Sequence, residues 1–350
     1  MRLTNFILGT SLTLLSTSAL AQPDSSGIDF VTISQPGNAP WTGNGGFNNN
    51  KGQVNYEYRI GRFEVTTAQW AEFMNAALDR PSDDHIPHAF APTEWGGVPT
   101  TPINPGGQRF NVPAGNAMLP AGGIDWRTCA IYCNWLHNNK SSDRSAFLSG
   151  AYDVSTFGYI GTTIFTDQVS RSPGARYYIP SADEWMKAAH WNPNRNGPGL
   201  GGWDLYSNGS DNPYTYGPPG VLVNGQPAMA NAGWDRFSFP GHDPYNVALG
   251  AYTGVTSPWG LFDVAGGTSE WTEATYQISD EPGPRFRFFE GSAWTWGFGN
   301  SSDHVRNPRG AEAPSFFGFD MGFRVAAAVV PAPTTAFVGA ASLPLFRRRR

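Results

Sequence analysis

The sequence is poor in charge, in cysteine and in long apolar runs. Charged residues make up 15% of the 350 residues, against about 25% in a typical soluble domain. Two cysteines, Cys129 and Cys133, are present, so the chain must fold through its core rather than through a disulfide framework. These absences exclude a coiled coil, a nucleic-acid binder with a basic face and a polytopic membrane protein.

Glycine, proline and aromatic residues take the place of charge. The chain has 42 glycines and 29 prolines, and aromatic residues make up 14% of it, including 13 tryptophans. Aromatic side chains bury enough surface for folding, while glycine and proline favour turns. The composition therefore predicts a folded, loop-rich domain.

The first 21 residues have the three parts of a secretory signal peptide. Arg2 precedes the apolar stretch 6–15, and Ala19 and Ala21 are the small residues that a signal peptidase reads. Cleavage is expected before Gln22. A buried N-terminal helix is the weaker alternative, because the stretch has no polar face. We therefore expect export.

Residues 331–350 form a C-terminal segment of unusual composition. Pro331 and Pro333 precede a small apolar stretch, residues 334–346, and four arginines close the chain. The segment resembles a PEP-CTERM sorting tail, which implies a Gram-negative-type envelope, transient anchoring in the inner membrane through the C-terminus, and later removal by sorting machinery. The alternative is a solvated basic tail.

Without its two ends the chain is acidic. Removing Arg2 and the four terminal arginines leaves 18 basic against 28 acidic residues, a net charge of −10 instead of −5. An acidic exported body suits extracellular solubility or cation binding and argues against a nucleic-acid partner.

Three helix starts stand out in an otherwise irregular sequence. Thr66 with Gln69 and Ser181 with Glu184 form capping boxes, and Asp125 can cap the apolar stripe that follows it. Short strand-like pieces occur at 56–60 and 322–326. Long glycine- and proline-rich stretches separate these elements, and no repeat or linker divides the chain. The pattern predicts an α+β domain held together by loops.

Five segments, in this order, resemble the formylglycine-generating enzyme (sulfatase-modifying factor) domain. They are residues 63–70, 123–136, 178–185, 260–271, and 291–292 with 322–326. The resemblance covers residues 28–330. It implies a single α+β domain with a C-type-lectin-like fold and little regular secondary structure.

The family's chemistry depends on a cysteine pair that this chain lacks. The family oxidises a sulfatase cysteine to formylglycine with O₂ and copper(I), which two cysteines hold after a Gly-Gly-Ser motif. Thr295 and Asn300 stand in those places, and residues 291–322 contain no cysteine. Because soft thiolates select copper(I), the resemblance implies that copper-dependent activity is lost.

Cys129, Cys133 and His137 follow one another at intervals of four residues. On a helix they would form a column able to ligate a metal. The favoured alternative is that both cysteines pack in the core. The family can also join the Cys133 position to a cysteine in the last segment by a disulfide, but Val325 stands there.

The resemblance also implies calcium at two places. One set of ligands is Asp263, Gly266, Thr268 and Glu270, and the other is Asn231, Ala232, Asp243 and Tyr245. Oxygen ligands from loops suit a hard cation. The alternatives are a buried Glu270 paired with an arginine, and an Asp243 that caps a turn.

The stretch after residue 291 overlies the family's substrate groove. Ser292, Trp294, Trp296 and Asn300 would line this groove, and indole rings can stack on a sugar or a peptide, although such rings often fill a core. We expect an exported, calcium-stabilised module that binds a peptide or glycan at the cell surface.

The alternative is an enzyme. A metal-dependent oxidoreductase, of the formylglycine-generating or non-haem-iron type, would act on a protein cysteine or a small thiol. His85, His88 or His304 would then be recruited to the metal.

Overall fold

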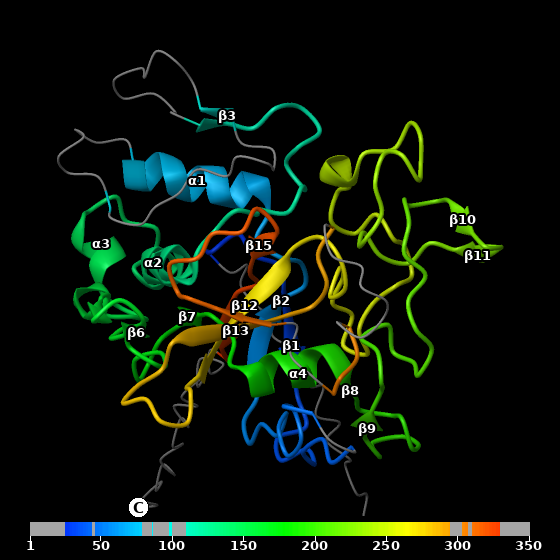
Figure 1. The fold of residues 1–350 in the computed structure, drawn as a ribbon, viewed down its shortest axis with the longest axis horizontal. Helices are drawn as coiled ribbons and strands as arrows, with labels where there is room; N and C mark the ends of the chain where they lie inside the picture. The colour runs from blue at the N-terminus through cyan, green and yellow to red at the C-terminus, as the bar shows by residue number, and fades with distance from the viewer. Residues whose placement is uncertain are drawn as a thin grey trace, which may run out of the picture.

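The computed structural model describes residues 25–43, 46–78, 86, 98–99, 110–294, 303–306 and 310–329. Figure 1 shows few helices, small sheets and much irregular chain. The helices are α1 (Thr67–Leu78), α2 (Trp126–His137), α3 (Ser145–Leu148) and α4 (Ala182–His190), with short 3₁₀ turns at Val154–Thr156 and Pro244–Asn246. The predicted α+β, loop-rich fold is confirmed. The signal peptide and the C-terminal tail lie outside the described residues.

The strands are short. They are β1 (Phe30–Ile33), β2 (Tyr58–Gly61), β3 (Val98–Pro99), β4 (Phe110–Asn111), β5 (Tyr159–Ile160), β6 (Ile164–Phe165), β7 (Tyr177–Tyr178), β8 (Trp191–Asn192), β9 (Gly202–Trp203), β10 (Leu222–Val223), β11 (Gln226–Pro227), β12 (Ser269–Tyr276), β13 (Phe286–Glu290), β14 (Gly310–Glu312), β15 (Met321–Gly322) and β16 (Ala326–Ala328). None of the described helices is long and apolar enough to cross a membrane.

Three helices begin at the predicted caps. The Thr66 hydroxyl accepts a hydrogen bond from the Gln69 N–H at 3.2 Å, and the Gln69 side chain accepts one from the Thr66 N–H at 3.0 Å. The Asp125 carboxylate accepts from the N–H of the third residue of α2, and the capping box before α4 is complete. These side chains satisfy backbone donors that a helix leaves open at its start.

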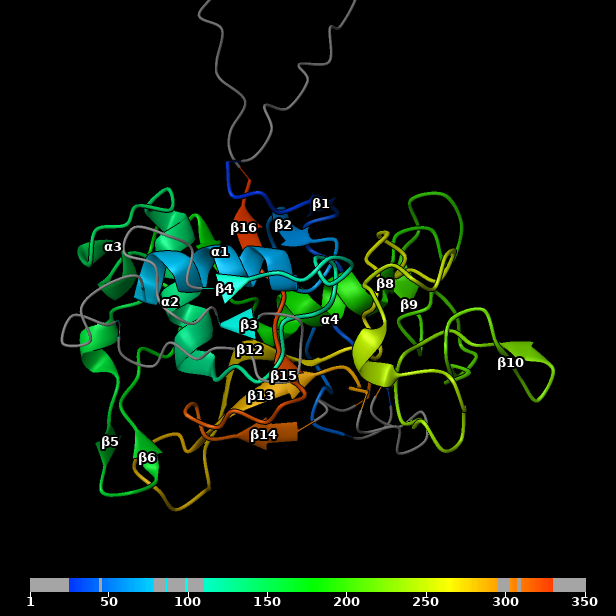
Figure 2. The same ribbon diagram turned by 90° about the horizontal axis from the view of Figure 1, so that it is seen from above.

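Two four-stranded sheets carry the fold (Figure 2). In the first, the strand order is β1-β2-β16-β7, with β2 antiparallel to both β1 and β16. In the second, the order is β14-β13-β12-β15, and β12 pairs in parallel with β15. The strand-like piece at 322–326 is not one strand: β15 ends at Gly322 and β16 begins at Ala326.

Aromatic side chains fill the main core between α1 and α2. The ring centroid of Trp70 lies 4.9 Å from that of Phe73 and 5.5 Å from that of Tyr132. Cys129 and Cys133 are fully buried in the same core. The core alternative for the two cysteines is therefore confirmed. We call α1, α2 and the sheet β1-β2-β16-β7 the core half.

Residues 192–262 build the other part of the molecule, which we call the loop half. They lie to the right of α4 in Figure 1 and contain short strands and a 3₁₀ turn but no α-helix. Two small apolar clusters, centred on Tyr206 and on Trp234, pack there instead of one large core.

The two ends of the described chain lie on the same side of the molecule, near the residues that follow α2. A side chain at Gly27 would lie 3.5 Å from the Lys140 ammonium nitrogen. The Ala328 N–H donates to the Arg176 carbonyl, and the Arg176 guanidinium donates to Asn139. Figure 2 shows the blue first residues and the red last strand leaving the molecule on the same side.

Candidate functional site

A buried ion pair lies between β12 and the residues that lead into β16. Glu270 lies in β12, and both its oxygens accept hydrogen bonds from the Arg324 guanidinium, the shortest at 2.6 Å. The Trp185 indole N–H donates to the same carboxylate at 2.7 Å. Arg324 also donates to the carbonyl of Gly61 in the core half and to that of Phe262 in the loop half, so its guanidinium connects the two halves. The charge of Glu270 is thus already balanced, and the geometry favours the arginine-paired alternative over a calcium ligand at this residue.

Thr268, another residue of the first calcium set, binds a carboxylate that sequence reasoning missed. The Thr268 N–H and hydroxyl both donate to Glu64. Gly267 has a φ of 72°, and a side chain there would lie 2.6 Å from the nearer Glu64 oxygen, so only glycine fits. Burial first, and then the charge of Glu270, raises the pKa of Glu64 well above its ordinary value.

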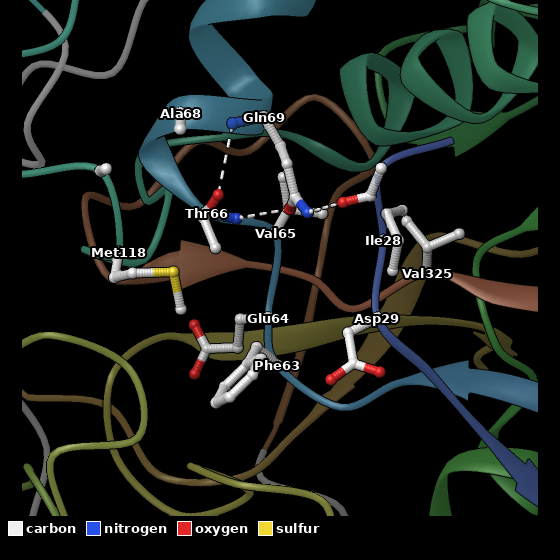
Figure 3. A pocket seen from close by; sticks show the side chains of 12 residues that line it. Ile28, Asp29, Phe63, Glu64, Val65, Thr66, Ala68, Gln69, Met118 and Val325 are labelled. Carbon is white, nitrogen blue, oxygen red and sulfur yellow. Dashed lines mark hydrogen bonds between the residues drawn. The ribbon is translucent and has the colours of Figure 1, made fainter. Parts of the chain in front are cut away.

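Glu64 also lies in the wall of a cavity of about 310 Å³. Figure 3 shows its carboxylate beside Phe63, with Met118 reaching toward it from the opposite wall. The walls are mostly apolar, and the carboxylate already has Thr268 as its partner. This cavity therefore has few polar groups that are free to bind a ligand.

Asp263 and Gly266 complete the first set, and each has protein partners. The Asp263 carboxylate accepts a hydrogen bond from the Gly250 N–H at 2.6 Å, and burial raises the pKa of Asp263 to about 6. The Gly266 N–H donates to Ser292. Asp263, Gly266 and Thr268 precede β12 and Glu270 lies in it, and both carboxylates of the set are engaged with protein donors.

The second calcium set has a free oxygen. The Asn231 amide donates to the Pro244 carbonyl at 2.9 Å, which brings Asn231 and the buried Ala232 next to the turn that holds Asp243 and Tyr245. Within the described residues, the buried Asn231 side-chain oxygen has no hydrogen-bond partner. A buried acceptor without a donor needs a ligand such as a cation or water. The residues here therefore fit calcium.

Asp243 can join Asn231 in such a site. One of its oxygens caps the 3₁₀ turn by accepting from the Tyr245 N–H at 3.1 Å. The other pairs with Arg236, whose side chain is 62% exposed. An exposed pair of this kind contributes little and can be exchanged for a cation. The turn-capping role and a calcium role are thus compatible.

The groove residues are described only in part. The Ser292 N–H donates to Asp303 at 2.8 Å, and the Ser292 hydroxyl accepts from the Gly266 N–H at 3.0 Å. The Trp294 ring centroid lies 3.9 Å from that of Tyr245. Thr295, Trp296 and Asn300 lie outside the described residues.

Exposed phenylalanines extend this aromatic surface, and the sequence reasoning did not single them out. Phe316, Phe317 and Phe319 are 42%, 58% and 48% exposed. Phe319 lies 5.8 Å from Trp294, ring centroid to ring centroid. We call Tyr245, Trp294 and Phe319, with the neighbouring exposed Phe316 and Phe317, the aromatic face. The sequence signal that could have predicted this surface is the occurrence of three phenylalanines within four positions.

The histidines do not form a metal centre in the described part of the chain. The His304 ring packs edge-on at 5.3 Å from Tyr206, and its Nδ1 accepts from the Arg306 N–H. Among the described residues, no three His, Cys, Asp or Glu side chains are placed to hold a metal ion. His85 and His88 lie outside them.

The comparison with known families decides where the chain belongs. Residues 21–329 match the sulfatase-modifying factor enzyme 1-like domain. The chain belongs to this family. A search of curated proteins finds no match.

Solved structures share the fold of this sulfatase-modifying-factor-like chain. The crystal structure of CarF is 17% identical, with a TM-score of 0.52 over 87% of this chain and 99% of that one. The variable protein 1 of Treponema denticola is 16% identical (TM-score 0.46, 86% and 95%), and PvdO from Pseudomonas aeruginosa is 16% identical (TM-score 0.42, 86% and 92%). At these identities the likeness to CarF shows the fold alone.

Proposed function

We propose that this sulfatase-modifying-factor-like protein is a calcium-stabilised binding module that has lost copper chemistry. The observation that carries the proposal is the absence of cysteine from residues 291–322, where the family's copper ligands would stand. Copper(I) needs soft sulfur ligands, and Thr295 and Asn300 offer none. The protein is in this sense a pseudoenzyme.

The two thiols of the chain cannot replace the missing pair. Cys129 and Cys133 are fully buried in α2 between aromatic rings. Burial raises the pKa of both thiols well above the ordinary value. The thiolate is the form that binds a metal or reacts with a substrate, so neither residue supports the family's chemistry.

Calcium would act in the loop half. The buried Asn231 oxygen, the Ala232 and Tyr245 backbone and the Asp243 carboxylate are the oxygen donors that would hold it. Oxygen donors from a loop suit Ca²⁺. Its role would be to fix the loops that support Tyr245, and hence Trp294 of the aromatic face.

The aromatic face would be the binding surface for a peptide or a glycan. Phe319 lies beside Trp294, and Phe316, Phe317 and Phe319 present apolar rings to solvent. Aromatic rings bury large areas at low entropic cost, and they dominate recognition surfaces. Ser292 lies at the edge of this surface, and its backbone is held in place by the hydrogen bond that its N–H donates to Asp303.

Export would place this surface outside the cell. The signal peptide at 1–21 and the arginine-ended tail at 331–350 support passage through a Gram-negative-type envelope, with transient anchoring and processing by sorting machinery. The acidic body, with its net charge of −10, supports the same location and argues against a nucleic-acid partner.

One experiment tests the loss of catalysis. The metal content of the purified protein is measured, followed by O₂ uptake with a cysteine peptide of the sulfatase type. We expect calcium, no copper or iron, and no O₂ uptake. The variant Thr295→Cys/Asn300→Cys, which restores the thiols, is the matched control and should bind copper(I).

The opposite result has a clear meaning. Copper or iron in the unchanged protein, together with O₂ uptake, would overturn the proposal and support the metal-dependent oxidoreductase. Variants of His85, His88 and His304 would then show which histidine holds the metal.

A further inference from the structure

Arg236 lies at one end of the aromatic face. The carbon of its guanidinium is 5.8 Å from the centre of the Tyr245 ring. The Tyr245 ring centroid lies 3.9 Å from that of Trp294, which lies 5.8 Å from that of Phe319. The four side chains therefore form a continuous row, with a cation at one end and aromatic rings along the rest.

A turn holds the backbone of Arg236, while its side chain reaches into solvent. The Asp235 carboxylate accepts hydrogen bonds from the N–H groups of Phe237 and Ser238, at 3.1 and 2.7 Å. The Arg236 side chain is 62% exposed, and within the described residues it donates to a single oxygen of Asp243, at 2.7 Å. A guanidinium has several N–H donors in a planar fork, so most donors of Arg236 are available to a ligand.

The carboxylate that holds Arg236 is also one that fits calcium. Asp243 lies in the turn beside the buried Asn231 side-chain oxygen, which has no hydrogen-bond partner in the described part of the chain. An exposed ion pair contributes little to stability. A divalent cation on Asp243 would therefore weaken its attraction for the guanidinium and would itself repel the guanidinium. Arg236 would then be released from Asp243.

The local charge changes sign on the same event. Without calcium, the cationic Arg236 stands beside two carboxylates, those of Asp235 and Asp243, which gives a net charge of −1. A bound Ca²⁺ brings this net charge to +1. A carboxylate of a ligand would therefore be repelled in the first state and attracted in the second.

We propose that Arg236 is a calcium-controlled carboxylate-binding residue, and that the ligand of the aromatic face is an acidic peptide with apolar side chains. Arginine binds a carboxylate through two parallel hydrogen bonds. Phenylalanine rings have no hydrogen-bonding atoms, so the face suits apolar side chains better than the hydroxyl groups of a glycan. This inference rests on the proposed function, and it names the ligand class and the control of that site.

The test measures how strongly the full-length protein prefers an acidic peptide to a neutral one. The probes are a blocked pentapeptide in which leucine alternates with glutamate, and the same peptide with glutamine in place of glutamate. Calorimetry measures both affinities in excess calcium and in chelator. We expect the acidic peptide to bind about tenfold more tightly than the neutral one in calcium, and no more tightly in chelator.

Two variants separate the release of Arg236 from a general effect of calcium on the loops. Arg236→Gln should abolish the preference for the acidic peptide in both solutions. Asp243→Asn removes the partner of Arg236 together with a calcium ligand, so it should show the preference even in chelator. If calcium only fixed the loops, Asp243→Asn would lack the preference. Arg285→Gln is the matched control, because Arg285 pairs with Glu281 between β12 and β13, and it should keep the calcium-dependent preference.

The inference and the proposed function fail in different ways. Equal affinities for the two peptides in calcium, or a preference that persists in chelator, would overturn this inference. If that binding is still lost in Trp294→Ala, the proposed function stands. Failure of both peptides to bind at about 10 mM would also overturn the inference, and the proposed function falls with it if the protein binds no calcium. Binding of maltotriose instead of the peptides, lost in Trp294→Ala, would overturn this inference and support a glycan ligand.

Discussion

The core half and the loop half are held together by different interactions. In the core half, aromatic rings of α1 and α2 pack at centroid distances of about 5 Å in one large cluster. In the loop half, two small clusters leave most of the chain to hydrogen bonds between side chains and backbone. Apolar packing is non-directional and tolerates change, whereas a buried polar contact fails when one partner is removed.

The difference teaches where function can reside. The core half orders itself through local helix signals and burial, so it needs no ligand. The loop half has an unpartnered buried oxygen at Asn231 and presents Tyr245 to Trp294. We therefore expect ligands to affect the loop half first. The following experiments test this contrast.

Removing the guanidinium that connects the two halves should have the largest effect. Arg324→Met leaves the buried Glu270 carboxylate without its guanidinium, at an expected cost of about 3–5 kcal/mol in the free energy of unfolding. Urea denaturation measures it. Arg324→Met/Glu270→Met should recover much of the loss, because no unpaired charge remains. The exposed pair Lys140–Glu72 is the control, and Lys140→Met should cost less than about 1 kcal/mol. Equal costs for the two single variants would show that the buried Arg324 guanidinium does not couple the halves.

Calcium removal should come next. At a free calcium concentration of about 100 times the Kd, binding adds about 2.7 kcal/mol of stability. A chelator should therefore lower hydrogen-exchange protection at residues 231–245 while α1 and α2 stay protected. Asn231→Leu should abolish this dependence, and Asn212→Leu, at an exposed loop position, should keep it. Equal loss of protection in both halves, or none, would contradict the assignment of calcium to the loop half.

The pH dependence of the core half follows from the cap of α2. Burial raises the pKa of Asp125 to about 7. The pKa of Asp125 is higher in the folded than in the unfolded protein, so the folded protein binds this proton more tightly. The resulting contribution to the free energy of unfolding is fully present below about pH 4 and is lost as the pH rises to about 7. Asn caps a helix equally well and never ionises. Asp125→Asn should therefore gain stability over the unchanged protein between pH 5 and pH 8, on the order of 2 kcal/mol.

Urea denaturation at both pH values measures this gain. Asp153→Asn, at an exposed capping residue, is the control and should show no gain. A constant difference between Asp125→Asn and the unchanged protein at the two pH values would contradict the prediction.

The smallest effect should come from a single cap. Ser181→Ala removes the acceptor for the Glu184 N–H at the start of α4 and should cost about 1 kcal/mol. Ser181→Asn should keep most of that stability. The exposed turn in the loop half that Asp235 caps offers the comparison, and Asp235→Ala should cost less than about 0.5 kcal/mol. Equal costs would remove this part of the contrast.

The parts of the fold that local sequence specifies could be predicted. Each of the capping boxes, at Thr66 and at Ser181, spans four consecutive residues, and the two boxes predict the starts of α1 and α4 correctly. The strand-like piece at 322–326 was misread because Phe323, Arg324 and Val325 are all buried. A regular strand would alternate between buried and exposed positions, and here the buried ion pair of Arg324 turns the chain inward.

Features made by distant residues could not be predicted. Glu64 and Thr268 are 204 positions apart, and Arg324 and Glu270 are 54 apart, so no local pattern joins them. Gln35 has a left-handed φ of 56°, and distant residues hold it. Its side-chain oxygen accepts a hydrogen bond from the Trp191 indole N–H, and its backbone carbonyl accepts one from the Lys187 ammonium group. The resemblance predicts two sets of calcium ligands, and the geometry shows how they differ: the Glu270 carboxylate has protein partners, whereas the buried Asn231 oxygen has none among the described residues.

The two chain ends leave the domain on the same side, so a linker can connect them without crossing the core. Joining Gly27 to Ala328 by a short linker and reopening the chain between Asn224 and Gly225, in the turn of the β10–β11 hairpin, should give a circular permutant that folds. For the same reason the domain should tolerate insertion into a surface loop of a host protein through linkers at both ends.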